Sequence, residues 1–182
     1  MSTVGTAGVP VSPRRALALA AAVLAVAVLA SAAFWWRTHP HRLRGVGNET
    51  ALPVAVGRSA VVGLFGGPES GRIRIVRVQP RVAANTAGAD LRVLLCRGRG
   101  PDPVGTAFGT AGRVCASVRD PGGVLLGRLT RGGDYLVLEV TPHRTGTVVV
   151  NGLHVEYRAG WQRGAQDSGE VVVVRATKAA RG

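Results

Sequence analysis

Residues 135–158 read YLVLEVTPHRTGTVVVNGLHVEYR, and this stretch decides the fold class. In its first part Leu136, Leu138 and Val140 face one side of an extended strand, while Glu139 faces the other. Two further apolar runs, 147–150 and 153–158, are split by Asn151-Gly152. This dipeptide is a strong hairpin signal because both positions tolerate positive φ. The stretch therefore predicts three consecutive strands.

Short apolar runs separated by turn signals continue on both sides of this stretch. Further candidate strands cover residues 54–62, 72–78, 91–97, 114–118, 124–129 and 170–176. In the second of these, the change of phase at Val76 predicts a bulge. No long helical pattern lies between the runs, which disfavours a parallel sheet with crossover helices. The sequence predicts an all-β, immunoglobulin-like β-sandwich of about seven to nine strands over residues 54–177.

The N-terminal part of the chain carries a long uncharged segment. Residues 16–36 read ALALAAAVLAVAVLASAAFWW, which as a helix would span about 31 Å, close to the thickness of a bilayer core. The aromatic residues Phe34, Trp35 and Trp36 end the segment where an interfacial aromatic belt would lie. The segment predicts one transmembrane helix that acts as a retained signal anchor, with the lipid bilayer as its partner.

This helix divides the chain into a short cytoplasmic N-terminus (1–15), the anchor (16–36), a basic juxtamembrane linker (37–53), the β-sandwich (54–177) and a C-terminal tail (178–182). Ala30-Ser31-Ala32 also fits a signal-peptidase site, and cleavage there would release a freely secreted domain. The count of flanking arginines weakly favours the opposite orientation. Because the N-terminus is short and two cysteines follow, we expect a single-pass protein of the cell membrane with a cytoplasmic N-terminus and an extracytoplasmic C-terminal domain.

Cys96 and Cys115 are the two cysteines of the chain. Cys96 ends one candidate strand and Cys115 begins the next, a spacing that suits a disulfide across a loop of about 20 residues. Two buried thiols and a redox pair are the alternatives, although the C-x-x-C spacing of redox motifs is missing. A disulfide would place the domain in an oxidising compartment.

The chain is strongly basic, with a formal net charge of +13 carried mainly by dispersed arginines. The simpler interpretation is a solvated basic surface. The functional one is attraction to anionic lipid headgroups or anionic wall polymers. We do not expect nucleic acid as a partner, because export would separate the domain from it.

Motifs for catalysis are missing from the sequence. There is no G-x-S-x-G, no phosphate-binding loop and no H-E-x-x-H, and His143 and His154 are isolated from each other. The close pair His39 and His41 offers no evident third metal ligand. We therefore expect no enzyme activity, no catalytic residues, no cofactor and no metal.

The most distinctive surface candidate is the stretch 157–164, YRAGWQRG. Its Arg158, Trp161 and Arg163 have the composition of an interface anchor and are the candidate partner contact. The alternative interpretation is that Trp161 folds back over the open end of a small core.

The stretches VQPRVAANTAGADLRVLLCR (78–97) and LEVTPHRTGTVVVNGLHVEYRAGWQRGAQDSGEV (138–171) resemble single-pass envelope proteins of high-GC actinobacteria. The resemblance implies an exported β-sandwich on one N-terminal anchor and carries over no activity and no site residue. We expect a binding or accessory module at the cell envelope, whose partner is another envelope protein or an anionic wall polymer. The alternatives are a freely secreted binding protein, cleaved near Ala32, and an extracytoplasmic enzyme with dispersed catalytic residues.

Overall fold

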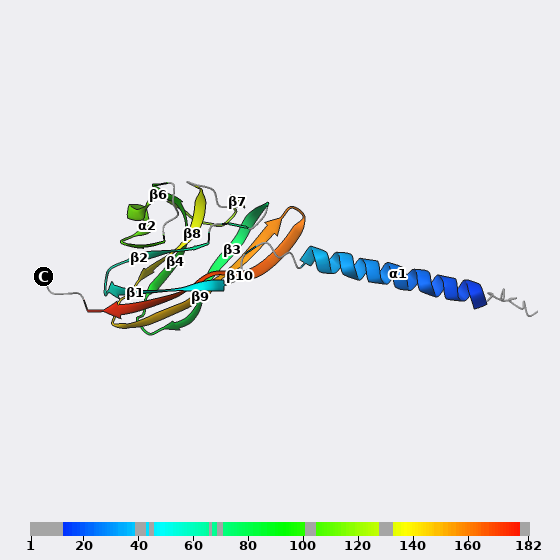
Figure 1. Cartoon of the computed structure of the whole chain (residues 1–182), viewed down its shortest axis with the longest axis horizontal. Helices are drawn as coiled ribbons and strands as arrows, with labels where there is room; N and C mark the ends of the chain where they lie inside the picture. Colours follow the sequence, from blue (N-terminus) through cyan, green and yellow to red (C-terminus); the bar gives the residue numbers. More distant parts are fainter. Residues whose placement is uncertain are drawn as a thin grey trace, which may run out of the picture. The chain divides into compact units, whose positions relative to one another are not determined.

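A computed structural model of the chain describes residues 13–38, 43, 46–65, 67–68, 71–100, 105–127 and 133–178. The chain divides into two units, residues 1–38 and 39–182. Among the described residues, the first unit contains one long helix, and the second contains the strands and a short helix (Figure 1).

Helix α1 spans Pro13–Thr38 and includes the whole predicted anchor segment. Its 26 residues extend over about 39 Å. The side chains of residues 17–38 are exposed, so no protein core covers this apolar surface. The helix is long and apolar enough to cross a membrane, a property that it shares with N-terminal signal sequences.

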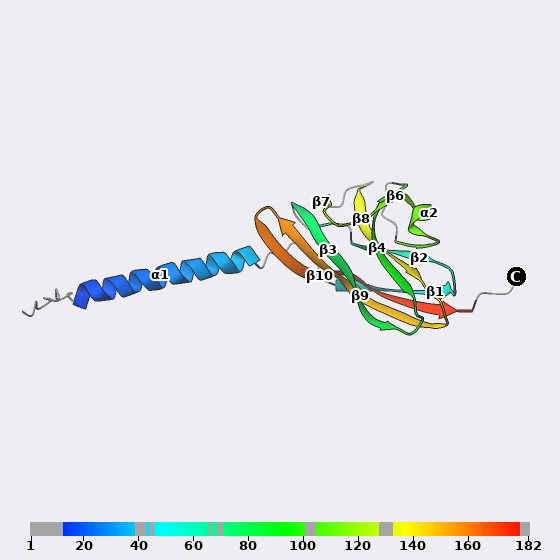
Figure 2. The same cartoon turned by 180° about the vertical axis from the view of Figure 1, so that it is seen from behind.

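The second unit consists of two five-stranded, curled sheets. The first sheet, sheet A, has the order β1 (Val46–Ala55), β10 (Gln162–Thr177), β9 (Gly146–Ala159), β3 (Arg72–Asn85) and β7 (Leu125–Gly127). The second, sheet B, has the order β5 (Thr106–Phe108), β2 (Ala60–Phe65), β8 (Asp134–Thr141), β4 (Asp90–Gly98) and β6 (Cys115–Arg119). Neighbouring strands are antiparallel except β1 and β10, which are parallel. Figure 2 shows the same sheets from behind.

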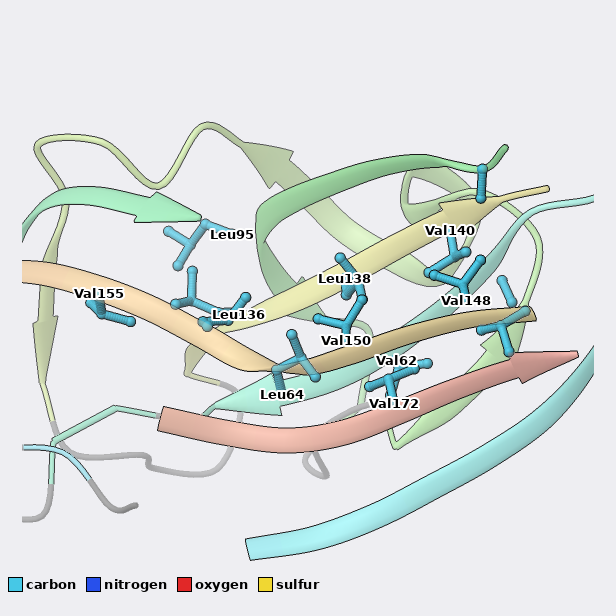
Figure 3. Packing of buried hydrophobic residues seen from close by; sticks show 14 of the residues in the cluster. Val62, Leu64, Leu95, Leu136, Leu138, Val140, Val148, Val150, Val155 and Val172 are labelled. Atoms are coloured by element: carbon cyan, nitrogen blue, oxygen red, sulfur yellow. The ribbon is translucent and has the colours of Figure 1, made fainter. Parts of the chain in front are cut away.

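The main core lies between the two sheets (Figure 3). Leu136, Leu138 and Val140 of β8 are fully buried in it, as their alternation predicts, and Val148 and Val150 of β9 face them. Burying side chains of this size contributes about 1.5–3 kcal/mol each.

A second apolar cluster covers the other face of sheet B. It consists of Val61, Cys96, Ala111, Cys115, Tyr135 and Val137 and lies beneath the short helix α2 (Ala111–Val114). Glu139, which the alternation of β8 places on this side, is buried, and its carboxylate accepts a hydrogen bond of 2.5 Å from the backbone N–H of Ala111. Sheet B is thus covered on both faces.

The predicted strand 54–62 is wrong, because the chain turns within it. Residues 56–59 form a turn that carries the chain from β1 in sheet A to β2 in sheet B. In this turn the Gly57 N–H donates to the Pro142 carbonyl and the Arg58 N–H donates to the Ala55 carbonyl. Because apolar residues lie on both sides of this turn, the sequence pattern does not show it. The β domain also begins at Val46, so the predicted linker 37–53 is too long.

The predicted hairpin at Asn151-Gly152 is also wrong. β9 runs through both residues from Gly146 to Ala159, and the reversal comes at Gly160 and Trp161 instead. Gly152 does adopt a positive φ of 70°, but it does so beside a register shift between Ser168 and Val171 of β10. There the glycine resets the phase of β9, so that burial moves from Val150 to Leu153.

Other predictions hold more closely. A register shift between Ile75 and Arg77 confirms the bulge at Val76. The predicted strand 170–176 is the last part of β10, which begins earlier, at Gln162, and ends at Thr177. The mostly β fold with one N-terminal apolar helix is confirmed, but the part of the chain that the structure describes has ten strands, more than the seven to nine predicted.

Candidate functional site

The predicted contact residues lie at the hairpin formed by β9 and β10, at one end of the β domain (Figure 1). Arg158 of β9 and Arg163 of β10 are register partners, so their side chains lie on the same face of sheet A. Tyr157 is buried on the opposite face, which places both arginines on the outer, solvent-facing side. The structure therefore brings Arg158 and Arg163 together.

Trp161 occupies the turn itself, next to Gly160, and is 57% exposed. The interpretation that Trp161 covers the open end of the core is wrong. Its neighbour Gln162 and the aromatic ring of Tyr157 are buried at this end instead. Trp161 is a large aromatic side chain at the tip of the hairpin, three residues after Arg158 and two before Arg163.

A third arginine, which the sequence did not single out, extends the pair. Arg74 of β3 is the register partner of Arg158, so Arg74, Arg158 and Arg163 form one lateral row across three strands. We call these three residues the arginine row. All three are exposed. The alternation in 72–78 places Arg74 on the outer face, but its pairing with a residue 84 positions away has no local sequence signal.

The arginine row is held partly by the backbone around it. The Arg74 Nη1 donates a hydrogen bond of 2.8 Å to the Gly123 carbonyl, in the turn before β7. Among the residues that the structure describes, no carboxylate forms an ion pair with Arg158 or Arg163. The nearest acid along the face is Glu156, whose register partner on β3 is Arg77.

Three cations side by side repel one another, since side chains in register on adjacent strands lie about 5 Å apart. Each guanidinium can also donate two parallel hydrogen bonds to a carboxylate or phosphate. The arginine row is therefore suited to an anion with several oxygens, which would relieve the repulsion as it binds.

Polar residues continue along the same outer face. His154 Nδ1 lies 2.8 Å from Asp167 Oδ1, and the other oxygen of Asp167 is 2.9 Å from Arg81 Nη1. His143 has a similar neighbour, with its Nε2 2.9 Å from Asp90 Oδ2. Each predicted isolated histidine thus lies beside one carboxylate. In the described part of the chain no group of three metal-binding side chains assembles around them.

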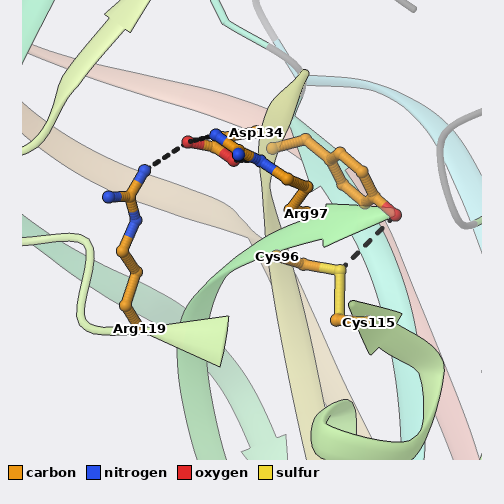
Figure 4. Close-up of polar contacts among 6 residues, drawn as sticks. Cys96, Arg97, Cys115, Arg119 and Asp134 are labelled. Atoms are coloured by element: carbon orange, nitrogen blue, oxygen red, sulfur yellow. Dashed lines mark hydrogen bonds and ion pairs between the residues drawn. A yellow bond between two sulfur atoms is a disulfide. The ribbon is translucent and has the colours of Figure 1, made fainter. Parts of the chain in front are cut away.

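The predicted disulfide between Cys96 and Cys115 is present, with an S–S distance of 2.06 Å and a Cα–Cα distance of 5.5 Å. It joins β4 to the start of β6 within the second apolar cluster (Figure 4). The Tyr135 hydroxyl lies 3.5 Å from Cys96 Sγ and must be the donor, because a disulfide sulfur carries no hydrogen. The disulfide has a structural role in sheet B, whereas the arginine row lies on sheet A.

A cluster of three charged side chains, Asp134, Arg97 and Arg119, lies near the disulfide on β8, β4 and β6. Asp134 accepts a hydrogen bond of 2.9 Å from Arg97 Nε and forms an ion pair with Arg119, so it links β8, β4 and β6 (Figure 4). Partial burial on its own would raise the pKa of Asp134. The hydrogen bond from Arg97 and the positive charge of Arg119 outweigh it, so the pKa lies below its ordinary value.

The predicted interfacial aromatics belong to the other unit. Phe34, Trp35 and Trp36 lie in the last turns of α1 and are exposed, as a belt at the end of a membrane span would require. No family model, curated protein or solved structure matches the chain.

Proposed function

We propose that the protein is a single-pass membrane protein whose β domain is a binding module at the cell envelope. In this proposal α1 is the anchor, the N-terminus is cytoplasmic and the β domain is extracytoplasmic. The disulfide supports the external location, because disulfides persist in oxidising compartments. The two facing sheets support an immunoglobulin-like variety of sandwich as part of the same proposal.

The observation that carries the proposal is the register of the hairpin. Arg158 and Arg163 face each other at its end, with Trp161 in the turn between them. An exposed aromatic anchor flanked by arginines is the composition of an interaction hot spot. The strands that hold these residues are paired next to the turn, so the backbone of the contact residues is ordered before binding and only side-chain entropy is lost there.

The proposed module binds and does not catalyse. His154 and His143 are exposed or partly exposed and each has one carboxylate partner, and among the described residues no hydrogen bond links either pair to a hydroxyl group. An enzyme that used such a pair would need a nucleophile within hydrogen-bond reach of the histidine. The proposed partners are an anionic component of the envelope or another envelope protein.

Photo-crosslinking in intact cells tests this proposal. A photoreactive phenylalanine analogue replaces Trp161 in one variant and Phe108, which is 68% exposed on β5, in the control. We expect membrane-associated adducts at position 161 and far fewer at position 108. Equal yields at both positions, or full-length protein missing from the membrane fraction, would contradict the proposal.

Orientation is tested separately with a C-terminal tag. Added protease should remove the tag from intact cells if the β domain is outside. A tag that resists protease in intact cells, but not in lysed ones, would overturn the proposed topology.

A further inference from the structure

We propose that the arginine row binds the phosphate groups of anionic phospholipids in the bilayer that holds α1, with the ring of Trp161 in the headgroup region. This inference rests on the proposed function and names the ligand class of its binding surface. The hairpin end then becomes a second membrane contact, in addition to the helix.

The spacing of the arginine row fits a headgroup surface. Adjacent strands lie about 4.8 Å apart, so three guanidinium groups cover a line of about 10 Å on one face. Arg72, two residues before Arg74 on β3 and also exposed, continues the positive charge toward the hairpin tip. A surface of several separate phosphates can engage all these groups, whereas a single small anion cannot.

Trp161 adds an apolar contact to the positive charges of the arginine row. Its ring is exposed at the tip, next to the arginine row, and tryptophan prefers the boundary between water and hydrocarbon. An aromatic ring beside arginines is the combination by which peripheral segments hold an anionic membrane. A soluble anionic polymer would use the charges but would offer no apolar phase for the ring.

The chain between the two units ends close to the arginine row. Leu43 is buried, its N–H donates to Gln166 Oε1 at 3.2 Å, and its carbonyl accepts from Gln166 Nε2 at 2.6 Å. Gln166 is three residues from Arg163 on β10, a distance of about 10 Å along the strand.

The length of this chain limits how far the arginine row can move from a membrane that holds α1. Residues 39–42 separate Thr38 from Leu43, and a fully extended chain of this length reaches at most about 18 Å. This limit holds whatever the orientation of the two units. A membrane-spanning α1 therefore keeps the arginine row within reach of the headgroups, which favours lipid over a more distant polymer.

The test uses the full-length protein in vesicles of phosphatidylcholine, either alone or mixed with phosphatidylglycerol. A portion of the phosphatidylcholine carries bromine near the headgroup and quenches nearby tryptophan. Because α1 also contains tryptophan, the signal of Trp161 is obtained as the difference between the protein and its Trp161→Phe variant. We expect quenching of this difference signal in the mixed vesicles and little in phosphatidylcholine alone.

A charge-matched pair of variants identifies the residues responsible. The double variant Arg158→Gln/Arg163→Gln removes two charges from the arginine row. The control, Arg58→Gln/Arg175→Gln, removes two exposed arginines from the other end of the domain. Each arginine near an anionic surface contributes about a fivefold gain in binding, so the first variant should dock about 25-fold less and the control should be unchanged.

Three results would overturn the inference. Quenching that is equal in both vesicle types, or equal in both double variants, would mean that the arginine row does not recognise the anionic lipid. The third result is that soluble poly(glycerol phosphate) abolishes the quenching and binds the full-length protein in phosphatidylcholine vesicles through the same two arginines. That outcome would assign the row to a polymer and leave the proposed binding module intact. If, in addition, the photoreactive group at position 161 gave no crosslinks in intact cells, the proposed function itself would be contradicted.

Discussion

Arg158 and Arg163 are direct register partners next to the turn of the β9–β10 hairpin, although like charges in this position destabilise a sheet. Arg74 repeats the relationship on the other side of Arg158. Ordinary surface design separates like charges or alternates them with acids. A repeated exception at one end of one face is what we expect of the proposed binding surface, at some cost in stability.

Replacing Arg163 with glutamate should therefore stabilise the isolated protein while weakening its attraction to anions. The Arg158–Arg163 repulsion becomes an attraction, which is worth about 0.2–1 kcal/mol for a cross-strand pair. Thermal unfolding followed by circular dichroism, at low salt, checks the direction. The control Arg175→Glu lies on the same strand opposite Thr147 and should give no such gain. An Arg163→Glu variant that is less stable than the control would mean that the two guanidinium groups do not repel each other.

The sequence predicts these local features unequally. The alternation of Leu136, Leu138 and Val140 predicts their common face because a strand has a period of two residues. It does not predict the row partner Arg74, because strand pairing over a long sequence separation depends on the whole topology. The hairpin predicted at Asn151-Gly152 is wrong because a local signal does not determine the packing. Positive φ at Gly152 is compatible with a bulge as well as with a turn, and the packing of Leu153 and Val155 decides for the bulge.

The disulfide should make a large contribution to stability. It closes a loop with a sequence separation of 19 residues, for which the chain-entropy model gives about 3 kcal/mol. The double variant Cys96→Ala/Cys115→Ala should lower the free energy of unfolding by about that amount in a urea titration. Tyr135→Phe, which removes only the hydroxyl beside Cys96 Sγ, should cost about 1 kcal/mol or less. A double variant as stable as Tyr135→Phe would contradict the structural role of the disulfide.

Asp134 gives the domain a defined dependence on pH. Its pKa is below the ordinary value in the folded protein, so its contribution is present above the unfolded-state pKa of about 3.9. That contribution is lost as the pH falls through the lower folded-state pKa. Asp134→Asn should cost about 1 kcal/mol at pH 7, and its stability should converge with that of the unchanged protein below about pH 4. Thermal unfolding across this pH range measures the difference. A constant difference at all pH values would show that the charge of Asp134 is not its cause.

Gln166 should control the freedom of the chain that leads from α1. Its side-chain amide both donates to the Leu43 carbonyl and accepts from the Leu43 N–H, so Gln166→Ala removes both hydrogen bonds to Leu43, together with the bond of 3.3 Å that Gln166 Oε1 accepts from the Tyr157 hydroxyl. We expect hydrogen exchange at the Leu43 amide to accelerate about fivefold or more, since the two bonds to Leu43 together are worth about 1–3 kcal/mol. Gln166→Glu keeps the acceptor for the Leu43 N–H but loses the donor to its carbonyl, and should therefore exchange at an intermediate rate. If Leu43 exchanged equally in all three proteins, burial of its side chain rather than Gln166 would fasten the chain. If instead Gln166→Ala also reduced the quenching of Trp161 by anionic lipid, the fastened chain and the arginine row would act together at the membrane.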